Sequence, residues 1–211
     1  MNIELFKRVL SSLILGPLAI FLIISGSFLF VFFLLICFFI TFYEWHLMSK
    51  KKSYNIYGII FMIFSFYSVY KLRFSFDESY VYLLFTTIIC ISTDIGGYIF
   101  GKIFKGPKLT KYSPKKTYSG VFGSYLLSLI CSAIFMNYFF INDLYIPWLL
   151  FIFFVSTISQ LGDLTISYFK RQASIKDTGN ILPGHGGLLD RIDGMIFAFP
   201  FSYMILSINF F

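Results

Sequence analysis

The chain alternates long apolar runs with short polar segments. Seven apolar runs can be read along it, at about residues 10–24, 28–43, 57–70, 80–100, 121–141, 145–161 and 195–211. A helix crosses a bilayer with roughly 20 mainly apolar residues, and these runs lack the period-two alternation of transmembrane strands. The pattern therefore predicts an all-α fold, a polytopic transmembrane helix bundle of about seven spans with one short span at residues 57–70.

Composition agrees with a membrane protein. Hydrophobic residues make up 58% of the chain, aromatic residues 22% and charged residues only 13%, far from the values of a soluble globular domain. The cysteines Cys37, Cys90 and Cys131 lie inside apolar runs at unrelated spacings. This arrangement indicates neither a disulfide framework nor a thiolate metal site.

The polar segments divide the chain into two unequal parts. Residues 1–79 hold a predicted helical hairpin and a third span, joined by short connectors. Residues 80–211 hold the remaining spans and two longer polar loops, at about 101–118 and 163–193. No internal repeat or soluble linker is visible, so we expect one membrane-embedded bundle whose chemistry lies in its C-terminal part.

Charge indicates the orientation of this bundle. A formal net charge of +7 would suggest nucleic acid in a soluble protein, but Lys and Arg in membrane proteins concentrate in cytoplasmic loops. When the loops are assigned alternately to two sides, all but two of the 17 basic residues share the side of the N-terminus. The exceptions are Lys71 and Arg73. We therefore expect a cytoplasmic N-terminus, both polar loops on the cytoplasmic face and no nucleic-acid partner.

Three acids stand at the boundaries of the last polar loop. Asp163 closes the sixth apolar run, while Asp190 and Asp193 are three residues apart before the seventh, a spacing that puts both on one helix face. Carboxylates that converge at a membrane boundary favour a divalent cation such as Mg²⁺. Spacing alone equally allows these acids to pair with Lys170, Arg171 or Arg191.

Glycine and lysine patterns suggest that phosphate binds nearby. Gly186 and Gly187 flank His185 in a PGHGG segment, where small residues let backbone amides approach an anion, although a flexible interfacial turn has the same composition. The upstream loop carries four further candidates for phosphate contacts, with a plain topology signal as the alternative. They are Ser113, Lys115, Lys116 and Thr117. Asp94 lies inside the fourth apolar run and should face the bundle interior, because a carboxylate is costly in lipid.

Taken together, these residues resemble the phosphatidate cytidylyltransferase (CDP-diacylglycerol synthase) family. The C-terminal signature of that family is matched at Ser167, Lys170, Arg171, Lys176, Asp177, Gly179, Pro183, His185, Gly186, Gly187, Asp190, Arg191 and Asp193. The SPKKT segment and the Gly162-Asp163 pair resemble its other landmarks. The chain departs from the pattern after SPKKT, where Tyr118, Ser119 and Gly123-Ser124 replace a tryptophan, an acid and paired glycines.

The resemblance implies transfer of a cytidylyl group from CTP to phosphatidate, with release of pyrophosphate. It implies catalytic roles for Asp163, Asp190, Asp193, Lys170, Arg171 and His185. It implies substrate contacts from Ser113, Lys115, Lys116, Thr117, Asp94, Lys176, Asp177, Gly186, Gly187 and Arg191. Asp163, Asp190 and Asp193 would hold Mg²⁺, with a second cation such as K⁺ left open.

The expected setting is a bacterial inner membrane, where lipid surrounds the chain and CTP arrives from the cytoplasm. A homodimer is left open, because small residues at Gly120, Gly123 and Ser124 allow close helix contact within or between subunits. Two other functions remain alternatives. A CTP-dependent lipid-alcohol kinase would use similar basic loops, and a transporter would use Asp94 and the loops to line a pathway.

Overall fold

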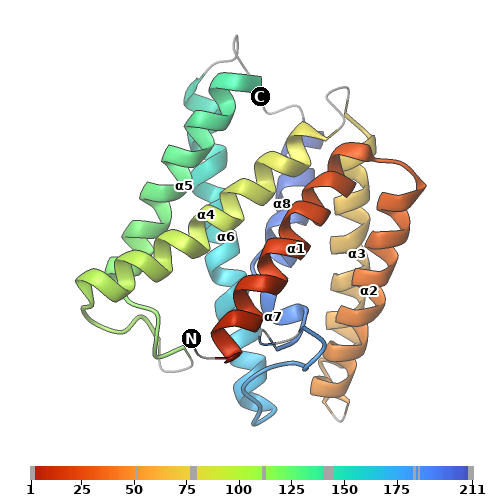
Figure 1. Cartoon of the computed structure of the whole chain (residues 1–211), viewed down its shortest axis with the longest axis vertical. Coiled ribbons are helices and arrows are strands. Elements are labelled where there is room, and N and C mark those ends of the chain that lie inside the picture. The colour runs from red at the N-terminus through yellow and green to blue at the C-terminus, as the bar shows by residue number, and fades with distance from the viewer. Residues whose placement is uncertain are drawn as a thin grey trace.

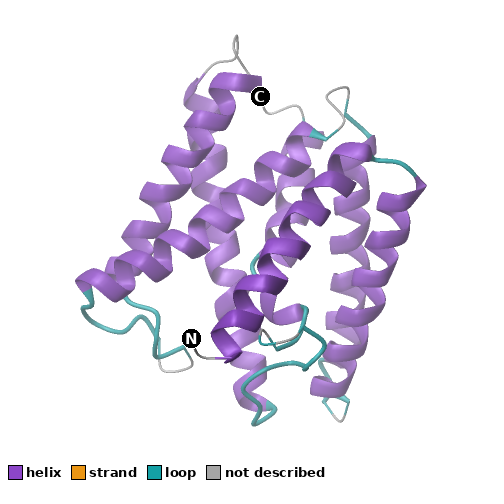
Figure 2. Cartoon of the chain, viewed as in Figure 1, coloured by secondary structure: helices purple, strands orange, loops and turns teal. Residues whose placement is uncertain are grey.

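The computed structural model describes residues 3–50, 52–76, 80–110, 113–139, 145–182, 184 and 186–208, with only the backbone described for residues 3–12 and 145. Within these ranges the chain forms eight helices (Figure 1). They are α1 (Ile3–Ser25), α2 (Phe28–Ser49), α3 (Asn55–Phe74), α4 (Val81–Phe104), α5 (Tyr118–Phe139), α6 (Tyr145–Gln172), α7 (Leu189–Ile192) and α8 (Met195–Ser207). Figure 2 shows helices joined by loops, with no strand in the described residues. The predicted all-α fold is confirmed.

Five helices, α2 to α6, are long and apolar enough to cross a membrane. Two shorter apolar stretches, Leu13–Ser25 within α1 and the whole of α8, accompany them. These seven segments coincide with the seven apolar runs. The run predicted as a short span is part of a helix of 20 residues, α3. The chain is thus a polytopic membrane bundle.

The sixth span extends further than the sequence predicted. Its apolar run ends near residue 161, and the polar loop was expected from residue 163, but α6 continues to Gln172. The added turns are amphipathic, because Ile166 is buried in a hydrophobic cluster while Asp163 and Lys170 line a pocket. Polar residues in this stretch therefore belong to a helix face. The two long connections run from 105 to 117 and from 173 to 188.

Both long connections lie at one end of the bundle. In Figure 1 this is the lower end, where α1 begins, while α8 ends at the opposite, upper end. The turn between α2 and α3 shares the lower end. The arrangement gathers the basic loops on one side, as alternating spans require.

Helices α4 and α5 touch through glycine. A Cβ atom on Gly96 would lie 2.3 Å from the carbonyl oxygen of Gly123, and one on Gly123 would lie 2.3 Å from Cβ of Phe100. Any side chain at either position would push the two backbones apart. Small residues are the usual means of close helix packing in membranes. The small residues of α5, which by sequence could have served contacts within or between subunits, therefore pack against α4 of the same chain.

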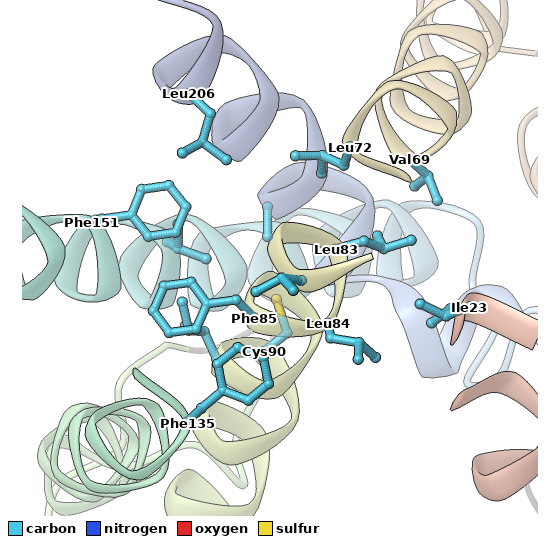
Figure 3. Close-up of a cluster of buried hydrophobic side chains, with 14 of the residues drawn as sticks. Ile23, Val69, Leu72, Leu83, Leu84, Phe85, Cys90, Phe135, Phe151 and Leu206 are labelled. Atoms are coloured by element: carbon cyan, nitrogen blue, oxygen red, sulfur yellow. The ribbon is translucent and has the colours of Figure 1, made fainter. Parts of the chain in front are cut away.

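The main core lies in the upper half of the bundle, where side chains of several helices meet (Figure 3). Phe85 of α4 is fully buried, and its ring lies 5.5 Å from that of Phe135 and 5.8 Å from that of Phe151, between centroids. Leu72 of α3 and Leu206 of α8 complete the cluster. Inside a membrane such contacts stabilise by packing, because lipid is as apolar as the core.

Arg73 secures the upper end of the N-terminal hairpin. Its Nε donates to the carbonyl oxygen of Ile23 at 2.6 Å, and its Nη2 donates to that of Ile24 at 3.1 Å. The last carbonyl groups of a helix have no partner within the helix. Arg73 of α3, 6% exposed, therefore satisfies the end of α1 and joins α1 to α3.

Candidate active site

A pocket of about 390 Å³ lies among α4, α5, α6 and α7, next to the long connections. Eleven of the residues predicted for the site line it, namely Asp94, Ser113, Lys115, Lys116, Thr117, Asp163, Lys170, Asp177, Asp190, Arg191 and Asp193. These residues are spread over a hundred positions of sequence. The fold therefore brings the SPKKT loop, the intramembrane aspartate and the C-terminal signature to one cavity.

Lys170 of α6 lies between two acids of the last polar segment. Its Nζ is 2.9 Å from Oδ1 of Asp190 and 4.0 Å from Oδ2 of Asp193. Lys170 is 9% exposed. One ammonium can reach both carboxylates only if they face the same side, which confirms the prediction made from their three-residue spacing.

Asp163 joins the upstream loop to α6. One of its carboxylate oxygens forms an ion pair with Lys116, and the other accepts a hydrogen bond at 3.2 Å from the hydroxyl of Ser167, one helical turn further on. The loop is held for this contact by its own backbone. The amide of Leu109 donates to the carbonyl of Lys116 at 2.8 Å. The hydroxyl of Thr117 accepts from the amide of Gly120, in the first turn of α5.

Asp190 organises the loop that precedes it. Its Oδ2 accepts hydrogen bonds from the backbone amides of Thr178, at 2.8 Å, and Gly187, at 3.1 Å. Gly186 has a φ of +88°, a conformation that favours glycine. The amide of Gly187 thus binds a carboxylate of the chain itself, and neither Gly186 nor Gly187 lines the pocket. Their predicted contact with substrate phosphate stays a prediction.

The fit of a metal ion can be judged from the same contacts. Among the residues that the structure describes, no three His, Cys, Asp or Glu side chains lie close enough to share a metal ion. The three acids predicted as ligands therefore do not form one cluster. Asp190 has donors on both oxygens, and Asp163 is bound by Lys116 and Ser167. Burial and the nearby charge of Asp163 raise the pKa of Asp193, which Lys170 only partly offsets. Asp163 and Asp193 both line the pocket, and a cation held by two carboxylates and substrate oxygens is the usual arrangement for Mg²⁺.

Besides the two glycines, two predicted residues that the structure describes, Arg171 and Lys176, do not line the pocket. Arg171 is exposed and donates from Nη1 to the carbonyl oxygen of Ile175 at 3.2 Å. Lys176 is exposed as well, and neither side chain lines the pocket. His185 lies outside the described residues. The roles assigned to these three from the resemblance stay predictions.

Sequence reasoning missed several parts of the site. Tyr98, Ser124 and Gln160 also line the pocket, but single polar residues in an apolar run carry no distinctive signal. Glu44 near the end of α2 is different. It is 1% exposed and binds the loop between α6 and α7. An acid at the end of an apolar run was the available signal, because such a group is costly unless it has partners.

The fold and this pocket define a membrane protein with a charged, phosphate-compatible cavity at one end of a helix bundle. Residues 6–77 and 57–209 match the model of the cytidylyltransferase family. The chain belongs to this family.

Named relatives agree with this assignment. The chain is 35% identical to a phosphatidate cytidylyltransferase of Rickettsia felis over 214 residues, which cover 96% of this chain and 92% of the relative. It is 41% identical to a phosphatidate cytidylyltransferase of Bacillus subtilis over 128 residues, which cover 60% of this chain. The chain spans 48% of the Bacillus protein. The family predicted from the sequence motifs is therefore confirmed.

Proposed function

We propose that the protein transfers a cytidylyl group from CTP to phosphatidate and forms CDP-diacylglycerol and pyrophosphate. The observation that carries this proposal is a pocket that gathers lysines of the SPKKT loop with acids and cations of the C-terminal signature. Relatives named phosphatidate cytidylyltransferase support the same reaction.

The reaction needs positioning more than a side-chain nucleophile. A phosphate oxygen of phosphatidate attacks the α-phosphorus of CTP, a new oxygen–phosphorus bond forms, and the bond to the β-phosphate breaks to release pyrophosphate. The phosphate monoester is anionic near neutral pH and attacks without a Ser or Cys intermediate. Catalysis then depends on holding the two phosphates together and on offsetting their charge.

The cations of the pocket offset that charge. Lys115, Lys116 and Arg191 line the cavity with Lys170, and each can bind an oxygen of the triphosphate, the lipid phosphate or the leaving pyrophosphate. Ser113 and Thr117 add hydroxyl donors at the same wall. Both substrates and the leaving group are thus met by positive charge.

We propose Mg²⁺ as the cofactor of this site. Asp163 and Asp193 would hold it, because both line the pocket; Asp163 would exchange its contact with Lys116 for the ion, and Lys116 would then face the substrate phosphates. When bound, the ion would neutralise phosphate oxygens and orient the triphosphate. Asp190 would act indirectly, because it binds Lys170 and the backbone of the loop before α7.

The location of the pocket suits one soluble and one lipid substrate. CTP reaches it from water, while the acyl chains of phosphatidate stay among lipids beside the helices. The excess of Lys and Arg at this end of the bundle supports a cytoplasmic face. Because the relatives are bacterial, we place the protein in the bacterial inner membrane.

The test is a turnover assay with CTP labelled in the cytidine. Purified protein should label phosphatidate in mixed micelles, release pyrophosphate and require Mg²⁺. A lipid-alcohol kinase would instead leave the lipid unlabelled and release labelled CDP. Asp193→Asn should abolish turnover while the protein still inserts and melts cooperatively, and Lys50→Ala, at an exposed residue that does not line the pocket, should not. Near-normal turnover in the Asp193→Asn protein would refute the assignment.

A further inference from the structure

Glu44 is the most completely buried acid that the structure describes, at 1% exposure. It lies in α2, outside the part of the chain that lines the pocket. Its Oε1 accepts from the amide of Leu188 at 2.9 Å, and its Oε2 accepts from the amide of Leu189 at 2.8 Å. The hydroxyl of Thr178 donates to Oε2 as well, at 3.1 Å. Both oxygens are therefore occupied by donors of a segment more than 130 positions away.

The same loop is held from its other side by Asp190. Thr178 donates its hydroxyl to Glu44 and its backbone amide to Asp190. Further along the loop, the amide of Gly187 donates to Asp190, and the amides of Leu188 and Leu189 donate to Glu44. The loop is thus held by two carboxylates at Thr178 and at residues 187–189. One of these, Asp190, also binds Lys170 in the pocket.

Two glycines show how closely the carboxylate of Glu44 approaches the loop. A Cβ atom on Gly179 would lie 2.7 Å from its Oε1, and one on Gly187 would lie 2.6 Å from its Oε2. Both distances are shorter than ordinary contact. The absence of side chains at these positions therefore serves to admit Glu44 as well as to shape the turn. The PGHGG segment has a structural use that is separate from phosphate binding.

We propose that Glu44 is a positioning residue for the reaction. It fixes the loop and the start of α7, and thereby sets Asp190 and Lys170 for the substrate phosphates. Glu44 touches no part of the pocket, so it acts through these residues and not on the substrate. The inference rests on the proposed cytidylyl transfer for its kinetic consequence, whereas its structural part stands independently.

The test compares Glu44→Gln with Thr41→Val. Thr41 is a buried polar residue of the same helix whose hydroxyl donates to the α2 carbonyl oxygens of Cys37 and Phe38, so its loss controls for general damage to α2. In Glu44→Gln an amide NH₂ must face backbone amides that need an acceptor. We expect kcat to fall at least about tenfold, because charged groups placed a fraction of an ångström off lose transition-state contacts.

A second measurement follows the loop without catalysis. Amide hydrogen exchange of a peptide covering residues 178–190 should be at least about tenfold faster in Glu44→Gln than in the wild-type protein, because one of the two protected amides loses its acceptor and faces an NH₂ group instead. Thr41→Val should leave both exchange and kcat unchanged. If the wild-type protein shows no cytidylyl transfer, the proposed function fails, and exchange alone still decides whether Glu44 holds the loop.

Thr178→Val guards against a Glu44 variant that does not fold. It removes the hydroxyl bound to Glu44 and keeps the backbone amide bound to Asp190. We expect a smaller effect in the same direction, about threefold to tenfold on kcat with faster exchange of the same peptide. Wild-type kcat or wild-type exchange, in Glu44→Gln or in Thr178→Val, would overturn the proposal.

Discussion

Replacing Lys170 by methionine tests the electrostatic core of the site. The substitution keeps most of the length of the side chain and removes its charge. Lys170 lies 2.9 Å from Asp190 and 4.0 Å from Asp193, and its side chain and those of the two acids are no more than 12% exposed. Its loss leaves two nearly buried carboxylates without their shared cation.

The size of the effect follows from these distances. At an effective dielectric constant of about 20, unit charges at the observed 2.9 Å attract by roughly 6 kcal/mol, much of which offsets desolvation. Removing one partner of a buried pair usually costs about 3–5 kcal/mol. Asp190 keeps two backbone amides as partners, so we expect the lower end of this range. A loss of about 3 kcal/mol corresponds to a melting temperature lower by roughly 6–12 °C for a chain of this size.

Thermal unfolding in detergent measures this loss, with Lys50→Met as the exposed control. The double variant Lys170→Met/Asp190→Asn should recover most of the stability, because an amide oxygen can still accept from the two backbone amides. It should not recover cytidylyl transfer, since the cation that faces the substrate phosphates is gone. Equal melting temperatures for Lys170→Met and Lys50→Met would show that Lys170 does not balance the two acids.

Two further substitutions test the packing of the bundle. Gly123→Ala places a methyl group 2.3 Å from Cβ of Phe100 and should destabilise the folded protein by about 1–3 kcal/mol. Gly16→Ala, where no atom lies within 4 Å of the new Cβ, should melt like the wild-type protein. Equal melting temperatures for the two variants would contradict the glycine contact. Arg73→Met removes two hydrogen bonds from the end of α1 and should lower stability by about 1–3 kcal/mol. Lys71→Met is its control, and KM for CTP should stay unchanged in both, so a selective rise in KM would show that Arg73 acts on the site.

The fold was largely predictable because a membrane restricts what an apolar run can do. Each run had to become a helix, and the distribution of Lys and Arg indicated which loops share a side. The limit of α6 was predicted wrongly for a related reason. Hydropathy marks where a helix leaves lipid, but Asp163 and Lys170 face a polar pocket inside the bundle, and the helix continues past them.

The site was predictable where motifs name the residues, and not where it depends on distance in the chain. The acids of the signature line one pocket together with Lys170 and the two lysines of the SPKKT segment. Spacing left open whether these acids bind a metal ion or pair with Lys170, Arg171 or Arg191. In the structure Lys170 pairs with Asp190, while Asp163 pairs with Lys116, a partner that the spacing did not indicate. The partnership of Glu44 with the loop spans more than 130 positions. No local pattern reports such a contact.

The glycine contact between α4 and α5 has a mechanical consequence for the loop that joins them. Where two backbones touch directly, at Gly96 and Gly123, no compressible layer of side chains lies between the helices, and neither can roll or slide without carrying the other. We therefore expect α4 and α5 to move as one rigid unit, which keeps the two ends of residues 105–117 at a fixed separation. The side chains of Lys115 and Lys116 can still change conformation, while the helix ends that anchor their loop stay fixed.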